Sequence, residues 1–347
     1  MDSKDRFRIL SLDGGGIRGA FSAAFLATLE SKLKLNLVDH FDLIAGTSTG
    51  GIIAAALAAG EPASRIVAMY REHGQKIFQR NIPKRGMFQR AKVGVMNTGI
   101  NWALKSDYDA LYSPKYDGQA LRRALEEVFQ KKRVSDITAT RLLIPTINLT
   151  TGTTVVIKTP HLPDLFRDKK HPLVDVIMAT TAAPTYFPHA VIDPGSAYID
   201  GGLWANNPSM VAYVEALKIA EKCCRPGIDP LHDHTSIRLL SVGTGESQSS
   251  VAPDKQKAGQ NFWKDHIFDT TINSQSQSAE NQIRYLMGNT NYQRINFRLP
   301  DTSWQLDSVQ HLDRLIHLGE EEACRKVANL ENLFFSNTKK QFVVWHS

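Results

Sequence analysis

The sequence predicts an α/β protein with a largely parallel central sheet flanked by helices. A strand, a sharp turn and a helix follow one another twice within residues 1–60. This alternation is typical of parallel sheets, whose strands are joined by crossover helices. The chain has 347 residues, of which 42% are hydrophobic and 22% charged. That composition is ordinary for a globular protein, and the length allows a substantial buried core.

The two N-terminal units carry this prediction. Residues 7–12 form a largely apolar run that predicts a strand, and the glycines at 14–16 follow it almost directly. Apolar residues then recur at helical spacing as far as Leu33, as expected for one face of a helix. A second apolar strand is expected at residues 41–45, with an alanine-rich helix at 52–59.

The later elements continue the α/β pattern. We expect helices at 117–130, from Pro172 to Met178 and at 211–223, and strands at 142–149, 154–159 and 237–242. Thr151 and Gly152 mark the turn between two of these strands, because such residues favour turns. Near the C-terminus, Ser308 can cap a helix that Gly319 ends, and a second helix follows through Phe334, on the usual start and stop signals.

Two stretches do not fit this pattern. Residues 81–116 are basic and contain scattered glycine and asparagine, and residues 246–292 are rich in serine, glutamine and asparagine. We interpret both as irregular insertions within one domain that spans residues 1–347. They could be lids, segments that contact a ligand, or surface loops with short helices.

The charge balance favours an anionic partner. Lysine and arginine outnumber aspartate and glutamate by 41 to 35, which gives a formal net charge of +6 and a pI near 9.1. Such an excess could fit an anionic membrane surface, a nucleotide or a nucleic acid, although solvated surface clusters are the more ordinary interpretation. The basic clusters lie far apart in the sequence and carry no RNA-binding or helix-turn-helix signature, so we expect no DNA or RNA polymer as a partner.

The sequence predicts a cytoplasmic protein. It has three cysteines, Cys223, Cys224 and Cys324, an odd number without zinc-finger spacing that favours a reducing compartment and no metal. Residues 1–6 lack the apolar core of a secretory signal, a feature that export requires. No run approaches the roughly 18 to 20 apolar residues of a membrane span.

The first glycine turn permits a dinucleotide-binding interpretation. Residues 14–19 read G-x-G-x-x-G between a strand and a helix, and Asp39 or Asp42 could contact a ribose, as in an NAD- or FAD-dependent oxidoreductase. Asp13 weakens this interpretation, because its charge would lie close to a pyrophosphate.

The second turn predicts a serine nucleophile. Gly46-Thr47-Ser48-Thr49-Gly50 is a G-x-S-x-G motif between a strand and a helix, which projects the serine above the sheet and directs a helix N-terminus at developing negative charge. With Ser48 as nucleophile, the N–H groups of Gly14, Gly15 and Gly16 could form an oxyanion hole. Arg18 could bind a phosphate, steady this loop or be solvated.

The serine needs a base, and the histidines offer no clear one. His189 lies in Phe-Pro-His, and His232 and His234 lie in a polar loop. Asp200 follows an apolar run and precedes two glycines. It could take the serine proton if burial raises its pKa, or it could be an ordinary Asp-Gly turn.

Four motifs in this order make the sequence similar to patatin-like phospholipases. They are Asp13-Gly-Gly-Gly-Ile-Arg-Gly19, Gly46-Thr-Ser-Thr-Gly50, Ala182-Ala-Pro-Thr-Tyr-Phe-Pro188 and Asp200-Gly-Gly202. The resemblance implies a three-layer patatin-like fold and a lipid acyl hydrolase that acts on phospholipids without calcium or another cofactor. It also implies a Ser48–Asp200 dyad in place of a triad, with the Gly14–Gly16 turn as oxyanion hole. The protein would then act at the inner face of the cell membrane.

A narrower resemblance is to bacterial patatin-like effectors of anti-phage systems that a cyclic oligonucleotide activates. It rests on chain length, the missing signal, and the stretches 148–161 and 204–208. It implies a cyclic dinucleotide activator and allows a homo-oligomer. Trp263 or Tyr285 could stack on bases, although partial burial under a surface loop is the ordinary interpretation. An ungated lipase and a catalytically silent nucleotide-binding protein remain alternatives.

Overall fold

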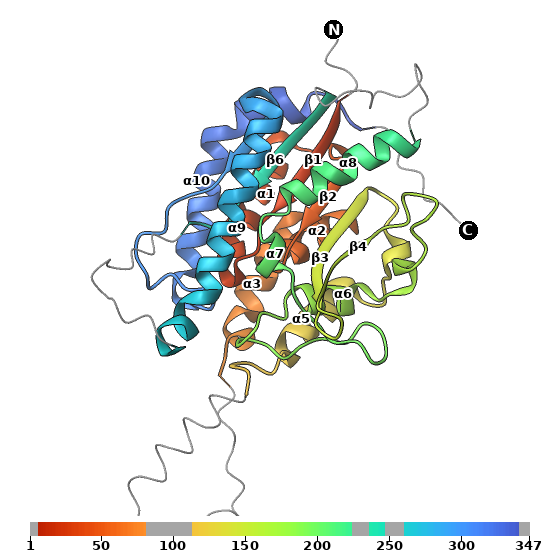
Figure 1. The fold of residues 1–347 in the computed structure, drawn as a ribbon. Helices are drawn as coiled ribbons and strands as arrows, with labels where there is room; N and C mark the ends of the chain where they lie inside the picture. Colours follow the sequence, from red (N-terminus) through yellow and green to blue (C-terminus); the bar gives the residue numbers. More distant parts are fainter. Residues whose placement is uncertain (1–5, 81–112, 224–235, 247–259, 340–347) are drawn as a thin grey trace, which may run out of the picture.

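The computed structural model of the protein describes residues 6–80, 113–223, 236–246 and 260–339. Within these ranges it contains a seven-stranded sheet in the order β4-β3-β2-β1-β6-β7, with β5 paired to β3. The strands are β1 (Phe7–Leu12), β2 (Leu43–Gly46), β3 (Arg141–Asn148), β4 (Thr153–Lys158), β5 (Tyr198–Asp200), β6 (Ile237–Val242) and β7 (Tyr292–Ile295). Figure 1 shows the sheet between two layers of helices.

The centre of the sheet is parallel. β1 runs parallel to β2 and β6, β2 to β3, and β6 to β7, whereas β4 and β5 are antiparallel to β3. Every residue of β1 and β2 is buried, as expected for strands covered on both faces. The predicted α/β class with a largely parallel sheet is confirmed.

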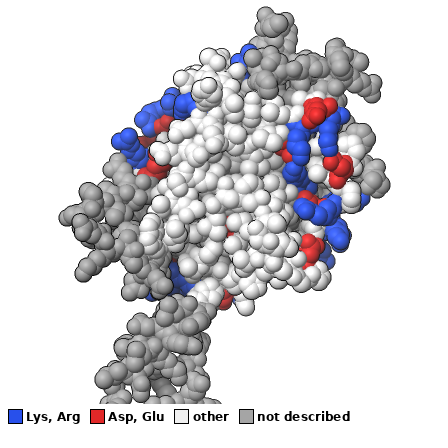
Figure 2. Space-filling model, viewed as in Figure 1, with Lys and Arg blue, Asp and Glu red and all other residues white. Residues whose placement is uncertain are grey.

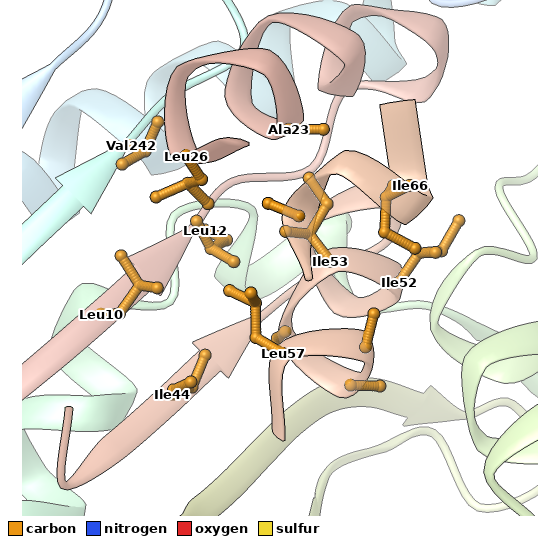
Figure 3. Close-up of a cluster of buried hydrophobic side chains, with 14 of the residues drawn as sticks. Leu10, Leu12, Ala23, Leu26, Ile44, Ile52, Ile53, Leu57, Ile66 and Val242 are labelled. Carbon is orange, nitrogen blue, oxygen red and sulfur yellow. The ribbon is translucent and has the colours of Figure 1, made fainter. Parts of the chain in front are cut away.

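The helices divide between the two faces of the sheet. They are α1 (Gly19–Leu33), α2 (Thr49–Ala58), α3 (Ala63–Ile77), α5 (Gln119–Phe129), α6 (Leu173–Thr180), α7 (Gly202–Ala205), α8 (Ser209–Cys223), α9 (Gln260–Asn291) and α10 (Leu312–Leu330). The larger core joins the sheet to α1, α2, α3, α5, α6 and α10, and the smaller core joins the other face to α8 and α9. In Figure 3, Leu12, Ile44 and Leu57 meet in the larger core.

The short strand β5 is placed where it can serve a site. β2 and β5 both pair with β3, with Ala45 opposite Leu143 and Asp200 opposite Thr146. β5 therefore continues along β3 beyond the point where β2 ends. This arrangement brings Asp200 next to the turn that follows β2.

The predicted C-terminal helices differ from the observed ones. α10 continues through Gly319 to Leu330 and passes directly into a π-helix at Glu331–Phe335. Gly319 is a packing residue, because a Cβ there would lie 2.3 Å from the Phe21 carbonyl oxygen of α1. Ser308 precedes a 3-10 turn and makes no side-chain cap. Close helix packing, which sequence signals do not show, explains this glycine.

The stretch 246–292 is far more regular than the sequence indicates. Most of it is α9, a 32-residue helix interrupted by non-helical backbone at Gly288. Its serines, asparagines and glutamines have only middling helix propensity, so contacts with α7, α8 and the sheet supply the stability that the sequence does not suggest. Tyr285 is 91% and Trp263 44% exposed on α9, so the expectation of burial under a loop is wrong for Tyr285. The other stretch falls largely on residues 81–112, outside the described residues.

None of the helices in the described ranges is long and apolar enough to cross a membrane. Figure 2 shows basic and acidic side chains mixed at the flanks of one face, with an uncharged area between them. No group of three or more possible metal ligands occurs among the described residues.

Candidate active site

Ser48 lies on a strained turn between β2 and α2. Its φ is 54° and its ψ −123°, a region that side chains rarely adopt and that marks nucleophile elbows. Glycines on both sides make the turn possible. A Cβ on Gly46 would lie 2.1 Å from the Gly50 carbonyl oxygen, and one on Gly50 would lie 2.2 Å from that of Leu12. The turn thus presents the serine at the N-terminus of α2, whose dipole favours negative charge.

Asp200 lies against Ser48 at the end of β5. It is 3% exposed, the Ser48 hydroxyl is close enough to act on its pKa, and its Oδ1 accepts the Gly202 N–H at 2.7 Å. Burial raises the pKa of Asp200 to about 7, although the Ser48 hydroxyl and the Gly202 N–H both act to lower it. A carboxyl group with a pKa near neutrality is suited to accept and return a proton.

Thr180 holds the turn at Ser48 and Asn206 holds the glycine loop, and the sequence did not identify either residue. The Ser48 N–H donates to Thr180 Oγ1 at 2.9 Å, and the Thr180 hydroxyl donates to the Pro145 carbonyl at 2.7 Å. The Asn206 carbonyl accepts the Gly14 N–H at 3.1 Å. Thr180 carries no signal in the sequence, whereas Asn206 begins a pair of asparagines four residues after Gly202.

The glycine loop reaches the same site with two of its three N–H groups. Gly15 and Gly16 line the pocket with Ser48, and no hydrogen bond within the described part of the chain occupies their N–H groups. The Gly14 N–H is already bound to Asn206. An oxyanion hole here would therefore use Gly15 and Gly16 and not Gly14.

Arg18 is packed beneath this loop. It is buried, and its backbone N–H and its Nε both donate to the Gly15 carbonyl, at 3.1 and 3.4 Å. Burial lowers the pKa of Arg18, and the charge of Asp269 acts in the opposite direction. Of the roles considered for Arg18, steadying the loop is the one these contacts perform. Its contact with a phosphate stays a prediction.

The site opens into a pocket. The walls are mostly apolar and come from α2, α3, α5, α9 and the loops around them. The lining residues include Ile52, Met69, Ile77, Phe78, Leu121, Phe187, Phe268, Ile272 and Leu306. No histidine, lysine or arginine is among the described lining residues. This lining suits an apolar group whose reacting end reaches Ser48.

The histidines are not brought to the serine. His189 is exposed and does not line the pocket, and His232 and His234 lie outside the described residues. Asp200 is thus the group with base character beside Ser48 in the described part of the chain.

The acidic residues that a dinucleotide site would need are elsewhere. Asp42 lies before β2, where its Oδ2 accepts the Arg8 N–H at 2.9 Å, at the opposite edge of the sheet from the glycine loop. Asp13 receives two hydrogen bonds from Arg294, at 2.9 and 2.6 Å. Burial alone would lower the pKa of Arg294, but the Asp13 carboxylate raises it above its usual value, so the pair is ionic. The geometry does not support the oxidoreductase alternative, because ribose recognition requires an acidic group near the glycines.

Known proteins resemble this chain over most of its length. Residues 10–213 match the family described as patatin-like phospholipase. A cGAMP-activated phospholipase of Pseudomonas aeruginosa (strain BWHPSA011 / Pa011) is 34% identical over 311 residues, covering 89% of this chain and 83% of that protein. A protein of the same name from Escherichia coli (strain TW11681) is 35% identical over 258 residues, covering 72% and 65%. Among solved structures, VipD from Legionella pneumophila aligns with a TM-score of 0.46 and 12% identity, covering 94% of this chain and 67% of that one.

Proposed function

This chain belongs to the patatin-like phospholipase family and is a hydrolase, and we propose that it cleaves acyl esters of membrane phospholipids through a Ser48–Asp200 dyad. The observation that carries the proposal is that Ser48 and a buried Asp200, whose pKa the Ser48 hydroxyl acts to lower, line the same apolar pocket. A serine hydroxyl is a weak nucleophile unless a base accepts its proton. Asp200, with a pKa near 7, meets that need without a histidine.

In the first half-reaction, Ser48 Oγ attacks the ester carbonyl carbon while its proton moves to the Asp200 carboxylate. The carbonyl π electrons move to oxygen, and the N–H groups of Gly15 and Gly16 stabilise the resulting oxyanion. The carbonyl bond then forms again, the bond to the leaving alcohol breaks, and Asp200 returns its proton to that alcohol oxygen. The product is an acyl group on Ser48.

In the second half-reaction, a water molecule replaces the alcohol. Asp200 accepts a proton from the water as it attacks the acyl carbon, and the same two N–H groups hold the second oxyanion. When this intermediate collapses, Ser48 recovers its proton from Asp200 and the fatty acid leaves. One carboxyl group therefore acts as base and then as acid in each half-reaction.

The pocket supports a lipid substrate. Its apolar walls surround the space next to Ser48, and burial of a long acyl chain there is favoured at about 0.8 kcal/mol for each CH₂ group. The mostly apolar lining among the described residues supports a position of the substrate phosphate outside this space. The acyl chain, and not the head group, would fill the pocket.

We place the membrane against the end of the molecule that holds the N-terminal half of α9 and the C-terminal end of α3 (Figure 1). Trp263 and Ile267 are 44% and 52% exposed, whereas Phe268 on the same helix lines the pocket. The exposed Lys76 and Arg80 flank the α3 end of the pocket. Exposed apolar side chains with cations beside them suit an anionic bilayer surface.

We further propose that a cyclic dinucleotide activates the enzyme and that the response serves anti-phage defence. Two relatives carry the name cGAMP-activated phospholipase. An ungated enzyme acting at the inner face of the cell membrane would attack its own membrane, so a latent state is chemically sensible. For near-complete switching, the activator must bind the active state about 10⁴-fold more tightly than the latent one.

The test is hydrolysis of phospholipid vesicles with and without cGAMP, run on the natural chain and on Ser48→Ala. We expect cGAMP to increase fatty acid release by the natural chain, and Ser48→Ala to lose at least about 10³-fold of it. A fluorophosphonate probe should label the natural chain and not the variant. Ser48→Ala should melt at nearly the same temperature, since the change removes one hydroxyl group.

Each outcome separates the alternatives. Turnover or labelling that persists in Ser48→Ala contradicts the dyad. Fast hydrolysis without cGAMP and no response to it leaves an ungated lipase. Binding of cGAMP without any hydrolysis favours a catalytically silent nucleotide-binding protein.

A further inference from the structure

We propose that Thr244 is a positioning residue, which aims the Gly15 N–H at the oxyanion of the reaction. Thr244 follows β6 and does not line the pocket. Nothing in the motifs assigns it a role. The inference rests on the proposed function, because it concerns how the oxyanion hole of that reaction is held.

The contact that carries the inference fixes a peptide plane. Thr244 Oγ1 donates to the Gly14 carbonyl oxygen at 2.7 Å, and Thr244 is 3% exposed. The Gly14 carbonyl and the Gly15 N–H belong to the same peptide group, which is planar and trans, so they point in opposite directions. A carbonyl held toward Thr244 therefore holds the Gly15 N–H away from Thr244. Gly15 lines the pocket together with Ser48.

The loop cannot easily turn away from this arrangement. A Cβ on Gly15 would lie 2.2 Å from Thr244 Oγ1, so the backbone of Gly15 lies directly against the threonine. The Gly14 N–H on the other side is held by the Asn206 carbonyl. That N–H belongs to the preceding peptide group, so the loop is held on both sides of the Gly14 Cα.

Thr244 is itself held rigidly. The neighbouring Gly243 N–H donates to the Ile295 carbonyl at 2.8 Å, and the Gly245 N–H donates to Asn296 Oδ1 at 2.9 Å. Ser22 Oγ donates to the Gly243 carbonyl at 2.8 Å. A supporting residue can orient a reacting group only if its own position is fixed, and these three contacts meet that condition.

The next peptide is held in the same way by a residue already described. Arg18 donates twice to the Gly15 carbonyl, and the Gly16 N–H shares that peptide group. Thr244 and Arg18 therefore act on successive peptides of the loop. Thr244 is the more informative residue to test, because its hydroxyl can be removed without changing a charge.

The decisive variant is Thr244→Val, which keeps the shape and removes the hydroxyl. On a soluble p-nitrophenyl ester, assayed with cGAMP present, we expect kcat to fall about 10- to 100-fold, as for other residues that orient a reacting group, with KM nearly unchanged. A boronic acid that forms a tetrahedral adduct on Ser48 should bind more weakly by the same factor. Thr244→Ser keeps the hydroxyl and should restore kcat.

The matched control is Thr140→Val. Thr140 Oγ1 donates to the Phe41 carbonyl at 2.6 Å and is fully buried, but it lies at the opposite edge of the sheet. Both variants lose a buried threonine hydroxyl that donates to a backbone carbonyl. A general effect of this loss on folding should therefore appear in both. We expect Thr140→Val to keep its kcat and its affinity for the boronic acid. Thermal unfolding is measured for both, and Thr244→Ala replaces Thr244→Val if the valine variant does not fold.

Two results would overturn the inference. One is a kcat for Thr244→Val equal to that of Thr140→Val, and the other is a Thr244→Ser variant as slow as Thr244→Val. Measuring Ser48→Ala in the same set of variants distinguishes a failure of the role of Thr244 from a failure of the proposed function. If Ser48→Ala still turns over the ester, the function itself is wrong. If it is inert and Thr244→Val is normal, only the role of Thr244 is wrong.

Discussion

At the scale of single residues, two buried aspartates have opposite surroundings. Asp13 faces the guanidinium of Arg294 in a two-hydrogen-bond ion pair, so its charge is neutralised where it stands. Asp200 has a serine hydroxyl and one backbone N–H as its partners. Without a cation, burial raises the pKa of Asp200 to about 7. This difference in partners supports the proposed roles, with Asp200 as the proton acceptor and Asp13 as a structural group.

The pH dependence should follow from Asp200. The carboxylate form accepts the serine proton, so kcat/KM on a soluble ester should rise with pH and level off above an apparent pKa near 7. Asp200→Asn should reduce turnover by about 10³-fold or more at every pH, because an amide cannot accept the proton. A pH–rate profile of both proteins checks this. A profile of the natural enzyme that is flat from pH 5 to 8 would exclude Asp200 as the titrating base.

Stability should change with pH in the opposite sense. The pKa of Asp200 is about 7 in the folded protein and near 3.9 in an unfolded chain, so the folded state holds the proton more tightly. The contribution to stability is complete below about pH 4 and is lost as pH rises through about 7, by roughly 4 kcal/mol in all. Asp200→Asn carries no such penalty. In urea unfolding, the gain in stability of Asp200→Asn over the natural chain should therefore be larger at pH 8 than at pH 5.

At the scale of elements, α9 connects the parts of the site. Phe268 and Ile272 form part of the pocket wall. Further along the helix, Ser276 Oγ accepts a hydrogen bond from Asn206 Nδ2 at 2.9 Å. Glu280 lies 3.4 Å from Arg294, the partner of Asp13. One helix thus contacts the pocket, Asn206 in the segment after Asp200, and Arg294, which pairs with Asp13 before the glycine loop. A change in the position of α9 would reach all three.

The exposed end of α9 provides a test of membrane contact. Ile267→Asp should lower hydrolysis of anionic vesicles about 10-fold or more, because insertion of an isoleucine contributes roughly 1.5–3 kcal/mol. Turnover of a soluble ester should not change, since Ile267 does not line the pocket. Val214→Asp is the control, because Val214 is 47% exposed on α8, which has no residue in the pocket lining. Equal loss in both variants, or none in either, would contradict the proposed orientation.

At the scale of the whole molecule, the parallel sheet gathers the site at one edge. The turns after β1 and β2 leave the sheet at the same edge, as parallel strands require, and β5 brings Asp200 to it along β3. Among the described residues that line the pocket at that edge, none is basic. A polyanion such as a cyclic dinucleotide needs several cationic contacts, so it should bind outside the pocket.

This separation gives a prediction for the activator. Ser48→Ala should bind cGAMP with the same Kd as the natural chain, because the activator does not use the catalytic cleft. A boronic acid bound to Ser48 of the natural chain should not displace cGAMP. Isothermal titration measures both. Direct competition between the two ligands would place the nucleotide in the catalytic pocket and contradict the proposal.

Features that depend on local chemistry could be predicted from the sequence alone. The strands at Phe7–Leu12 and Ile237–Val242 appear where largely apolar runs predict them, because buried parallel strands are mostly apolar on both faces. The position of Ser48 on a strand–turn–helix unit also follows from neighbouring residues, since the close contacts of Gly46 and Gly50 lie mostly within that unit and the adjacent strand.

Tertiary structure decided what depends on partners distant in the sequence. The sequence leaves Asp200 open to two interpretations, a base or an ordinary turn residue. Only the pairing of β5 with β3 places it in a buried site beside Ser48. The Gly14 N–H is occupied by Asn206, and Thr244 holds the Gly14 carbonyl from 230 residues away. The long helix α9 forms from residues without a clear apolar period. Burial, hydrogen-bond partners and packing are properties of the folded arrangement, so no local pattern could specify these features.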